Sequence, residues 1–403
     1  MSFLRQGYVT GPVIGVLWVF VAAVTVAVAM SFATGEAFRP SFLYALIVGA
    51  PLGAACIGGR YPQLMIAAGC AGFVVLMMLG IGPVLTDGAG VVARVIAGLL
   101  LGGAVMAPLT AFLADAHKGE MTRHVFEEAV IRFLTGFGYV FFTAIVFIPF
   151  YVMVMTSFKN QSELIQNPLD FSLDLSQGWG LFRSYVELFA DFNFGTYLFN
   201  SILISLLTVF ITLLFSVPGA YAVARLRFRG RALLSRSILL IYMVPIIVLA
   251  LPIYIAFSMT GLRNTILGIL LIYPVTTIPV ALYMLQGYFR GLPAEIEEAG
   301  LMDGLSRLAV IWKITLPLSL PALASVSLYV FMIAWNEFLL AFMLLDDPGK
   351  FTLTRGIASL NSSEIPRQHL MAGSVVATVP IMVLFLGLER FMTKGLTAGS
   401  VKG

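Results

Sequence analysis

The chain has 403 residues, of which 60% are hydrophobic and only 11% charged, and its mean hydropathy is +0.97. Soluble domains carry about 25% charged residues, so the composition excludes an ordinary soluble protein and indicates a polytopic membrane protein. The net charge of +4 is explained by basic residues in cytoplasmic loops and gives no reason to expect nucleic-acid binding.

Residues 1–120 predict an N-terminal extension with four transmembrane helices. The apolar runs lie at about 12–34, 41–58, 62–85 and 91–114, and each is close to the length that a spanning helix needs. The first run is too long for a signal peptide, so we interpret it as a signal anchor with a cytoplasmic N-terminus. Small residues four positions apart, at Gly49/Gly53 and Gly98/Gly102, permit close helix contact.

Residues 121–403 predict a core with six further spans, at about 136–157, 196–222, 236–258, 265–288, 320–345 and 370–391. The connection from Lys159 to Asp191 is mainly acidic and should lie outside. Five arginines between Arg225 and Arg236 follow the second core span and should lie inside. The same topology places the loop 291–317 and the tail with Arg390, Lys394 and Lys402 in the cytoplasm.

The loop 291–317 predicts a helix, a turn and a second helix outside the bilayer. Pro293 suits a first helical turn, and glutamates at that end favour the helix dipole. Gly304 should end the helix, and Ser306 can cap the next one. On these residues alone, an amphipathic loop is an equal alternative.

The loop also matches a family pattern. Glu298-Ala299-Gly300, then Gly304 and, after nine residues, Ile314-Thr315-Leu316-Pro317 resemble the EAA loop of permease subunits in binding-protein-dependent ABC importers. The segments YLFNSILISLL, AYAVARLRFRGR, IPVALYMLQGYF, IAWNEFLLAFMLL and GLTAGSVKG resemble the carbohydrate-uptake branch, and more narrowly the second permease of maltose-type systems. The resemblance covers about residues 125–403. The family usually has Ala in place of Gly300, and glycine should loosen the helix.

The resemblance implies an all-α polytopic membrane protein, with a six-helix ABC importer permease core preceded by four extra transmembrane helices. It implies a transport subunit of the bacterial inner membrane, multi-pass, with both termini cytoplasmic. The chain has no G-x-x-x-x-G-K-[ST] motif, so we expect no bound cofactor, and ATP and Mg²⁺ on a partner ATPase. The implied partners are two copies of an ATP-binding subunit, a second homologous permease, a periplasmic or extracellular solute-binding protein, and membrane lipid.

In the family, the loop helix docks in a cleft of the ATP-binding subunit. The resemblance implies that Glu298 makes the charged contact, that Gly304 allows the turn, and that apolar residues including Ile296 complete the contact. Helix-end stabilisation is the alternative role of Glu298. The candidate coupling residues are Glu298, Ala299, Gly300, Leu301, Met302, Gly304, Ile314, Leu316 and Pro317.

Polar residues within the core spans are candidates for a solute path, because sugars offer hydroxyl groups and apolar ring faces. The candidates are Ser205, Thr208, Thr212, Tyr329, Asn336, Glu337, Ser374 and Thr378. The first three belong to a stripe from Ser201 to Ser216 for which helix packing is the favoured interpretation. Glu337 is a functional candidate as the one carboxylate well inside a core span, although a buried interhelical hydrogen bond or a contact to the partner permease fits equally.

The expected solute is a sugar or oligosaccharide, although polyols and glycerol phosphates use similar permeases. Two other classes of protein stay open. An ion-coupled secondary transporter would need coupling residues in its spans, and Glu337 alone is a poor set. A membrane scaffold would place its function in the four N-terminal spans. No catalytic residues and no metal site are expected, because the histidines and Cys56 and Cys70 lack suitable spacing.

Overall fold

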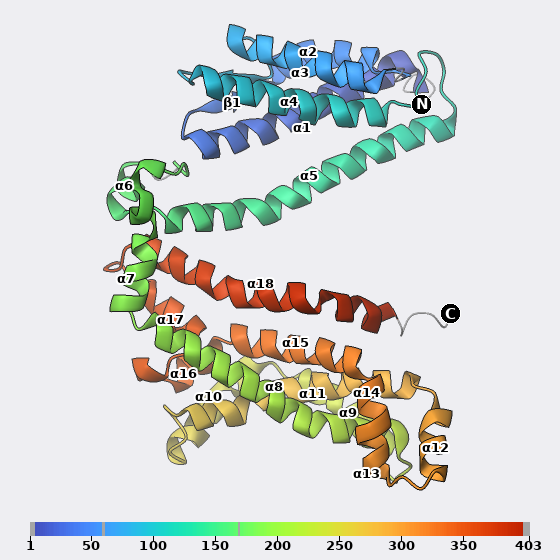
Figure 1. Ribbon diagram of the computed structural model, residues 1–403, viewed down its shortest axis with the longest axis vertical. Helices are drawn as coiled ribbons and strands as arrows, with labels where there is room; N and C mark the ends of the chain where they lie inside the picture. The colour runs from blue at the N-terminus through green and yellow to red at the C-terminus, as the bar shows by residue number, and fades with distance from the viewer. Residues whose placement is uncertain (1–4, 59–60, 168–169, 398–403) are drawn as a thin grey trace. The chain divides into compact units, whose positions relative to one another are not determined.

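The computed structural model describes residues 5–58, 61–167 and 170–397, and side-chain positions are described as far as residue 388, apart from a few earlier residues. It divides into two compact units, Met1–Leu181 and Phe182–Gly403 (Figure 1). The predicted boundary at 120/121 marks where the extension ends and the core begins, and it stays a prediction. Of the basic tail residues, the side chains of Arg390 and Lys394, and the whole of Lys402, lie outside the described residues.

The first unit contains helices and one short two-stranded sheet. Its elements are α1 (Gly7–Thr34), β1 (Phe38–Pro40), α2 (Phe42–Ala55), α3 (Pro62–Leu79), β2 (Val84–Thr86), α4 (Val91–Phe112), α5 (Arg123–Ser157), α6 (Gln161–Gln166) and the 3₁₀ segment η2 (Leu175–Phe182). The strands pair antiparallel, with Phe38 opposite Thr86. The first core span begins earlier than predicted, because Thr122 caps α5 and Arg123 pairs with Glu127 one turn later.

Glycines bring the helices of the first unit into backbone contact. A Cβ atom on Gly53 of α2 would collide with the carbonyl of Gly11 on α1, and one on Gly98 of α4 would meet the Cα of Val74 on α3 at 2.6 Å. Both small-residue patterns therefore lie at helix contacts, as predicted.

The second unit is entirely helical in its described part. Its elements are α7 (Arg183–Asp191), α8 (Phe194–Arg225), α9 (Arg231–Tyr242), α10 (Ile246–Met259), α11 (Ile266–Gly291), α12 (Ala294–Met302), α13 (Arg307–Val310), the π-helical η3 (Ile311–Thr315), α14 (Leu316–Leu318), α15 (Leu320–Asn336), α16 (Leu339–Leu344), η4 (Pro348–Lys350), α17 (Leu353–Leu360) and α18 (Arg367–Thr397). Helix α8 packs along α11 and α15, and Tyr273, Val326 and Trp335 are among the buried side chains.

All ten predicted apolar segments contain helices. Within the described ranges, seven helices are long and apolar enough to cross a membrane, or eight if the bent pair Arg307–Leu318 and Leu320–Asn336 forms one span. The exceptions have local causes. Helix α2 has 14 residues, or about 21 Å at 1.5 Å per residue. The third core segment breaks into α9 and α10 ahead of Pro245, because the residue before a proline disfavours the α conformation. The fifth ends at Asn336, and α15 follows the preceding helices Arg307–Leu318 at a bend of 78°.

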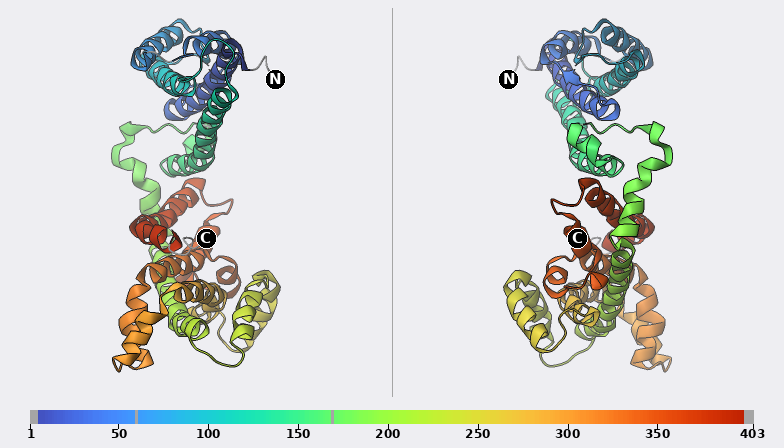
Figure 2. Two further views of the ribbon diagram at one scale, coloured as in Figure 1. Left: turned by 90° about the vertical axis from the view of Figure 1, so that its right-hand side faces the viewer. Right: turned by 90° about the vertical axis from the view of Figure 1, so that its left-hand side faces the viewer.

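Two ends of the second unit can be told apart. Helices α12 and α13 lie at one end of α8, and α16 and α17 lie at the other (Figure 1). Figure 2 shows residues 231–259, in yellow-green, on one side of this unit and the orange α12–α14 on the other. The helices of loop 291–317 thus form a separate projection from the packed spans.

Candidate functional site

Loop 291–317 folds as the predicted helix, turn and second helix. Helix α12 follows Pro293 and carries Glu295 and Glu297 in its first turn. At its other end, Leu305 N–H donates to the Gly300 carbonyl at 3.1 Å, and Gly304 has a φ of +83°. Helix α12 therefore ends at a residue with a left-handed backbone conformation, which glycine adopts without steric cost.

The second helix begins where it was expected, and it changes from α-helical to π-helical geometry after Val310. Ser306 accepts a hydrogen bond from Ala309 N–H at 3.3 Å and so caps α13. The chain then forms the wider π-helical turn η3, a form often found at functional positions. It reaches α15 through the 78° bend, so the loop joins the span at a sharp angle.

A buried carboxylate fastens the loop to α8. Glu297 is 8% exposed. Its Oε2 accepts a hydrogen bond from the Tyr221 hydroxyl at 3.2 Å, and its Oε1 accepts one from the Thr315 hydroxyl at 3.0 Å. Arg225 Nε lies 3.4 Å from Glu297 Oε1, and the same guanidinium donates to the Leu292 carbonyl at 2.6 Å. One side chain of α12 thereby joins the end of α8 to η3.

Sequence reasoning missed this anchor and treated Glu297 only as a helix-end charge. Tyr221 and Glu297 are 76 positions apart, and no local spacing connects residues so distant in the chain. The available signal was the second of three glutamates on a short helix together with an arginine at the end of a span. That signal does not identify the pair.

The predicted coupling residues divide between two faces. Glu298 and Ala299 are exposed, and Met302 is 88% exposed. Gly300 is buried, and a Cβ atom there would lie 2.5 Å from Ile314 Cδ1. The glycine in place of the family's alanine therefore sits inside the loop, where only the flexible end of Ile314 would have to move. Leu301 and Leu316 are half-buried, and Pro317 is exposed.

The loop also bears exposed large apolar side chains, of which the sequence had named Ile296 and Met302 and had not singled out Leu308 or Trp312. Ile296 is 43% exposed, Leu308 70% and Trp312 71%. Together with Met302 they form what we call the loop patch. Exposed large apolar groups on one loop are typical of a protein interaction site.

The hydroxyl stripe of α8 lies inside helix contacts. Ser205, Thr208 and Thr212 are fully buried. Thr212 forms a hydrogen bond of 2.7 Å with Thr277 of α11, and Ser201 accepts one of 2.6 Å from Leu353 N–H. The packing interpretation accounts for these contacts in this conformation, and a solute path along the stripe stays a prediction.

Glu337 follows α15 in an extended conformation and caps the next helix. Its carboxylate accepts hydrogen bonds from Leu340 N–H at 2.8 Å and Ala341 N–H at 3.1 Å, two amides of the first turn of α16. The Thr354 hydroxyl of α17 donates to the Glu337 carbonyl at 2.6 Å. The contacts thus give Glu337 a part in holding α15, α16 and α17 together.

The remaining path candidates bond within their own helices or lie partly exposed. Ser374 and Thr378 of α18 donate to Leu370 and Ser374 carbonyls one turn earlier, and Asn336 donates to the Met332 carbonyl. Tyr329 is half-buried. The described contacts do not bring these candidates into one site. Among the residues searched, no group of three or more His, Cys, Asp or Glu could hold a metal ion.

Comparisons with known proteins agree with the loop pattern. Residues 216–397 match the family described as binding-protein-dependent transport system inner membrane component. The inner membrane ABC transporter permease protein YcjP of Escherichia coli (strain K12) is 39% identical over 66% of this chain and 95% of that protein. The trehalose/maltose transport system permease protein MalG of Thermococcus litoralis is 35% identical over 69% of this chain and 99% of that protein.

A solved structure shares the fold. A chain of a bacterial ABC transporter involved in the import of the acidic polysaccharide alginate superimposes with a TM-score of 0.58 at 23% identity, over 68% of this chain and 99% of that chain. The matched fold accounts for about two thirds of the present chain.

Proposed function

Because the chain belongs to the inner membrane components of binding-protein-dependent transport systems, we propose that it forms part of the path by which a sugar or oligosaccharide enters the cell. It is a multi-pass inner membrane transport subunit of the ABC permease family and not an enzyme. Such a system includes a solute-binding protein, an ATPase and a second permease. We further propose two ATPase copies, which carry the ATP and Mg²⁺, and a cytoplasmic location for both termini.

The observation that carries the coupling role is the two-sided construction of α12. Glu297 holds its inner face to α8 and η3, while Glu298 and the loop patch face outward. A helix fixed on one side and exposed on the other can pass a movement of a bound ATPase to the spans. Glu298 supplies the charge, the loop patch supplies the apolar area, and the Gly304 turn returns the chain to η3.

The solute class rests on the relatives. They include a trehalose/maltose permease, the arabinooligosaccharide permease AraQ of Halalkalibacterium halodurans and the trehalose permease SugB of Mycobacterium tuberculosis. Ion-coupled transport is less well supported, because the contacts of Glu337 are those of a helix cap. Ser205, Thr208 and Thr212 would have to separate from their neighbours in another conformation to meet solute.

Charge reversal at Glu298 tests the coupling role. We expect Glu298→Lys to release the ATPase on purification and to abolish ATP-driven uptake, without loss of the chain from the membrane. Glu364→Lys makes the same change at an exposed residue of the connection between α17 and α18, and it should retain the ATPase. Normal ATPase retention and uptake in Glu298→Lys, at normal expression, would exclude docking through this residue.

A further inference from the structure

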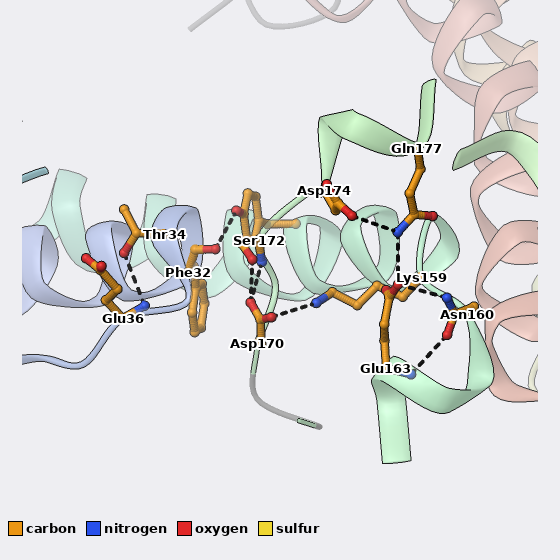
Figure 3. Close-up of polar contacts among 11 residues, drawn as sticks. Phe32, Thr34, Glu36, Lys159, Asn160, Glu163, Asp170, Ser172, Asp174 and Gln177 are labelled. Carbon is orange, nitrogen blue, oxygen red and sulfur yellow. Dashed lines mark hydrogen bonds and ion pairs between the residues drawn. The ribbon is translucent and has the colours of Figure 1, made fainter. Parts of the chain in front are cut away.

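The N-terminal extension makes a specific attachment to the connection that follows α5. Residues 158–167 and 170–177 of that connection are called the outer segment here, because its charge places it outside. Lys159 is 6% exposed, and its Nζ lies 3.2 Å from Asp170 Oδ2. Asp170 Oδ1 also accepts from the Ser172 amide at 2.9 Å and the Ser172 hydroxyl at 2.6 Å. An ion pair between a buried lysine and a half-buried aspartate therefore joins the start of this segment to its middle (Figure 3).

The end of α1 packs directly against this ion pair. Gly35 has a φ of +71°, and a Cβ atom there would lie 2.7 Å from Asp170 Oδ1 and 3.2 Å from Ser172 Oγ. Glycine is therefore required twice at this position, for its left-handed backbone and for the space that Asp170 and Ser172 occupy.

Aromatic rings complete the attachment. Phe32 of α1 packs edge-on against Phe171 at 5.0 Å between centroids and stacks on Tyr151 of α5 at 5.7 Å. The Tyr151 hydroxyl donates to the Phe32 carbonyl at 3.2 Å. Phe171 is only 9% exposed, so the outer segment places an apolar ring against the extension. Such aromatic pairs stabilise packing beyond their buried area.

The outer segment is also ordered within itself. Asn160 caps α6 by accepting from Glu163 N–H at 3.0 Å, and Gln177 donates to Glu163 Oε1 at 2.9 Å (Figure 3). Together with the Lys159–Asp170 ion pair, these bonds link the two described parts of the segment, so a shift of Asp170 would also act on Lys159 and α6.

We propose that the N-terminal extension serves to hold the outer segment in one position, so that the solute-binding protein meets a preformed outer surface. The extension lies outside the matched family region at 216–397, and its α1 carries the contacts with Asp170, Phe171 and Tyr151. The inference rests on the proposed function, because it requires a binding protein on the outer side. Binding to an ordered segment avoids the entropic cost of ordering it on contact.

The test uses the complete transporter in lipid nanodiscs with its binding protein. Gly35→Ala changes only the extension side of the attachment, and Asp170→Asn changes only the outer segment. The matched control is Gly88→Ala, because Gly88 has a φ of +89° in the same extension with no atom within 4 Å of its Cβ position. It imposes the same backbone strain without the collision.

Two readouts are measured, namely amide hydrogen exchange over residues 160–167 and 170–181, and the binding-protein concentration that half-maximally stimulates ATP hydrolysis. Both variants should exchange about tenfold faster, as for the loss of one buried charged contact, and should need several times more binding protein. Basal ATP hydrolysis of both variants should equal that of wild type, and the control Gly88→Ala should equal wild type in both readouts. Unchanged exchange would show that the attachment does not hold the segment, and faster exchange with an unchanged titration would refute its role toward the binding protein.

Failure of the proposed function gives a different result. In that case the wild-type complex itself shows no stimulation by a binding protein. Should Gly35→Ala fail to assemble, Asp170→Asn reports on the same contact from the other side.

Discussion

The anchor of α12 allows a quantitative prediction. Glu297→Gln keeps one of the two oxygens that accept from Tyr221 and Thr315, and it removes the charge opposite Arg225, whose side chain is only 13% exposed. Breaking a buried ion pair by removing one partner costs about 3–5 kcal/mol, and the retained hydrogen bond reduces this to about 2 kcal/mol, or roughly a thirtyfold shift toward an undocked α12. Uptake should fall accordingly, while ATP hydrolysis by the assembled complex falls less.

The assay is ATP-driven uptake into proteoliposomes, with ATP hydrolysis measured on the same preparation. Arg225→Gln should give a similar loss of uptake per ATP, and the double variant should be no worse than either single change, because both remove one interaction. Glu295→Gln alters an exposed glutamate of the same helix and serves as the control. Additive losses in the double variant, or wild-type coupling in Glu297→Gln, would refute the anchoring role.

Three further predictions concern other parts of the chain. Gly304→Val should weaken ATPase retention, because a branched residue at a φ of +83° costs at least about 1–2 kcal/mol, and co-purification measures this. Arg183 and other donors lower the pKa of Glu187, so the unfolded state binds more protons on acidification. The stability that the Glu187 carboxylate contributes should be fully present above the usual glutamate pKa of about 4.3 and should be lost as pH falls through its lower pKa in the folded state. Melting curves measured across this pH range should lose that dependence in Glu187→Gln. Gly53→Ala should lower the melting temperature of the purified chain, because its Cβ would collide with a carbonyl of α1, whereas Gly72→Ala, which faces open space, should not.

Much of the fold was predictable because each span must satisfy its own backbone within an apolar solvent, and apolar runs therefore locate the helices. The coupling loop was predictable in the same local sense, since Pro293, Gly304 and Ser306 act within one or two turns of their positions. Local reasoning also placed Glu298 correctly on a helix, and the structure adds that it is exposed.

What the sequence could not predict depends on contacts between distant residues. Glu297 is anchored by Tyr221 and Arg225 from another helix, and Lys159 pairs with Asp170 on the far side of α6. The sequence predicted that Glu337 lies inside a span, because no helix-breaking residue at this point indicates that α15 ends at Asn336. The partners of Glu297 lie outside the range that periodicity and capping rules cover, whereas the Glu337 cap is local and depends on where α15 ends.

The central claim is that this chain is a permease subunit driven by a separate ATPase, and mild-detergent purification of the tagged chain from its native membrane tests it most directly. Mass spectrometry should then identify an ATP-binding subunit, a second permease and a solute-binding protein, and the reassembled complex should take up a sugar only with ATP. Recovery of the chain alone, able to move a solute into vesicles without ATP, would contradict the account.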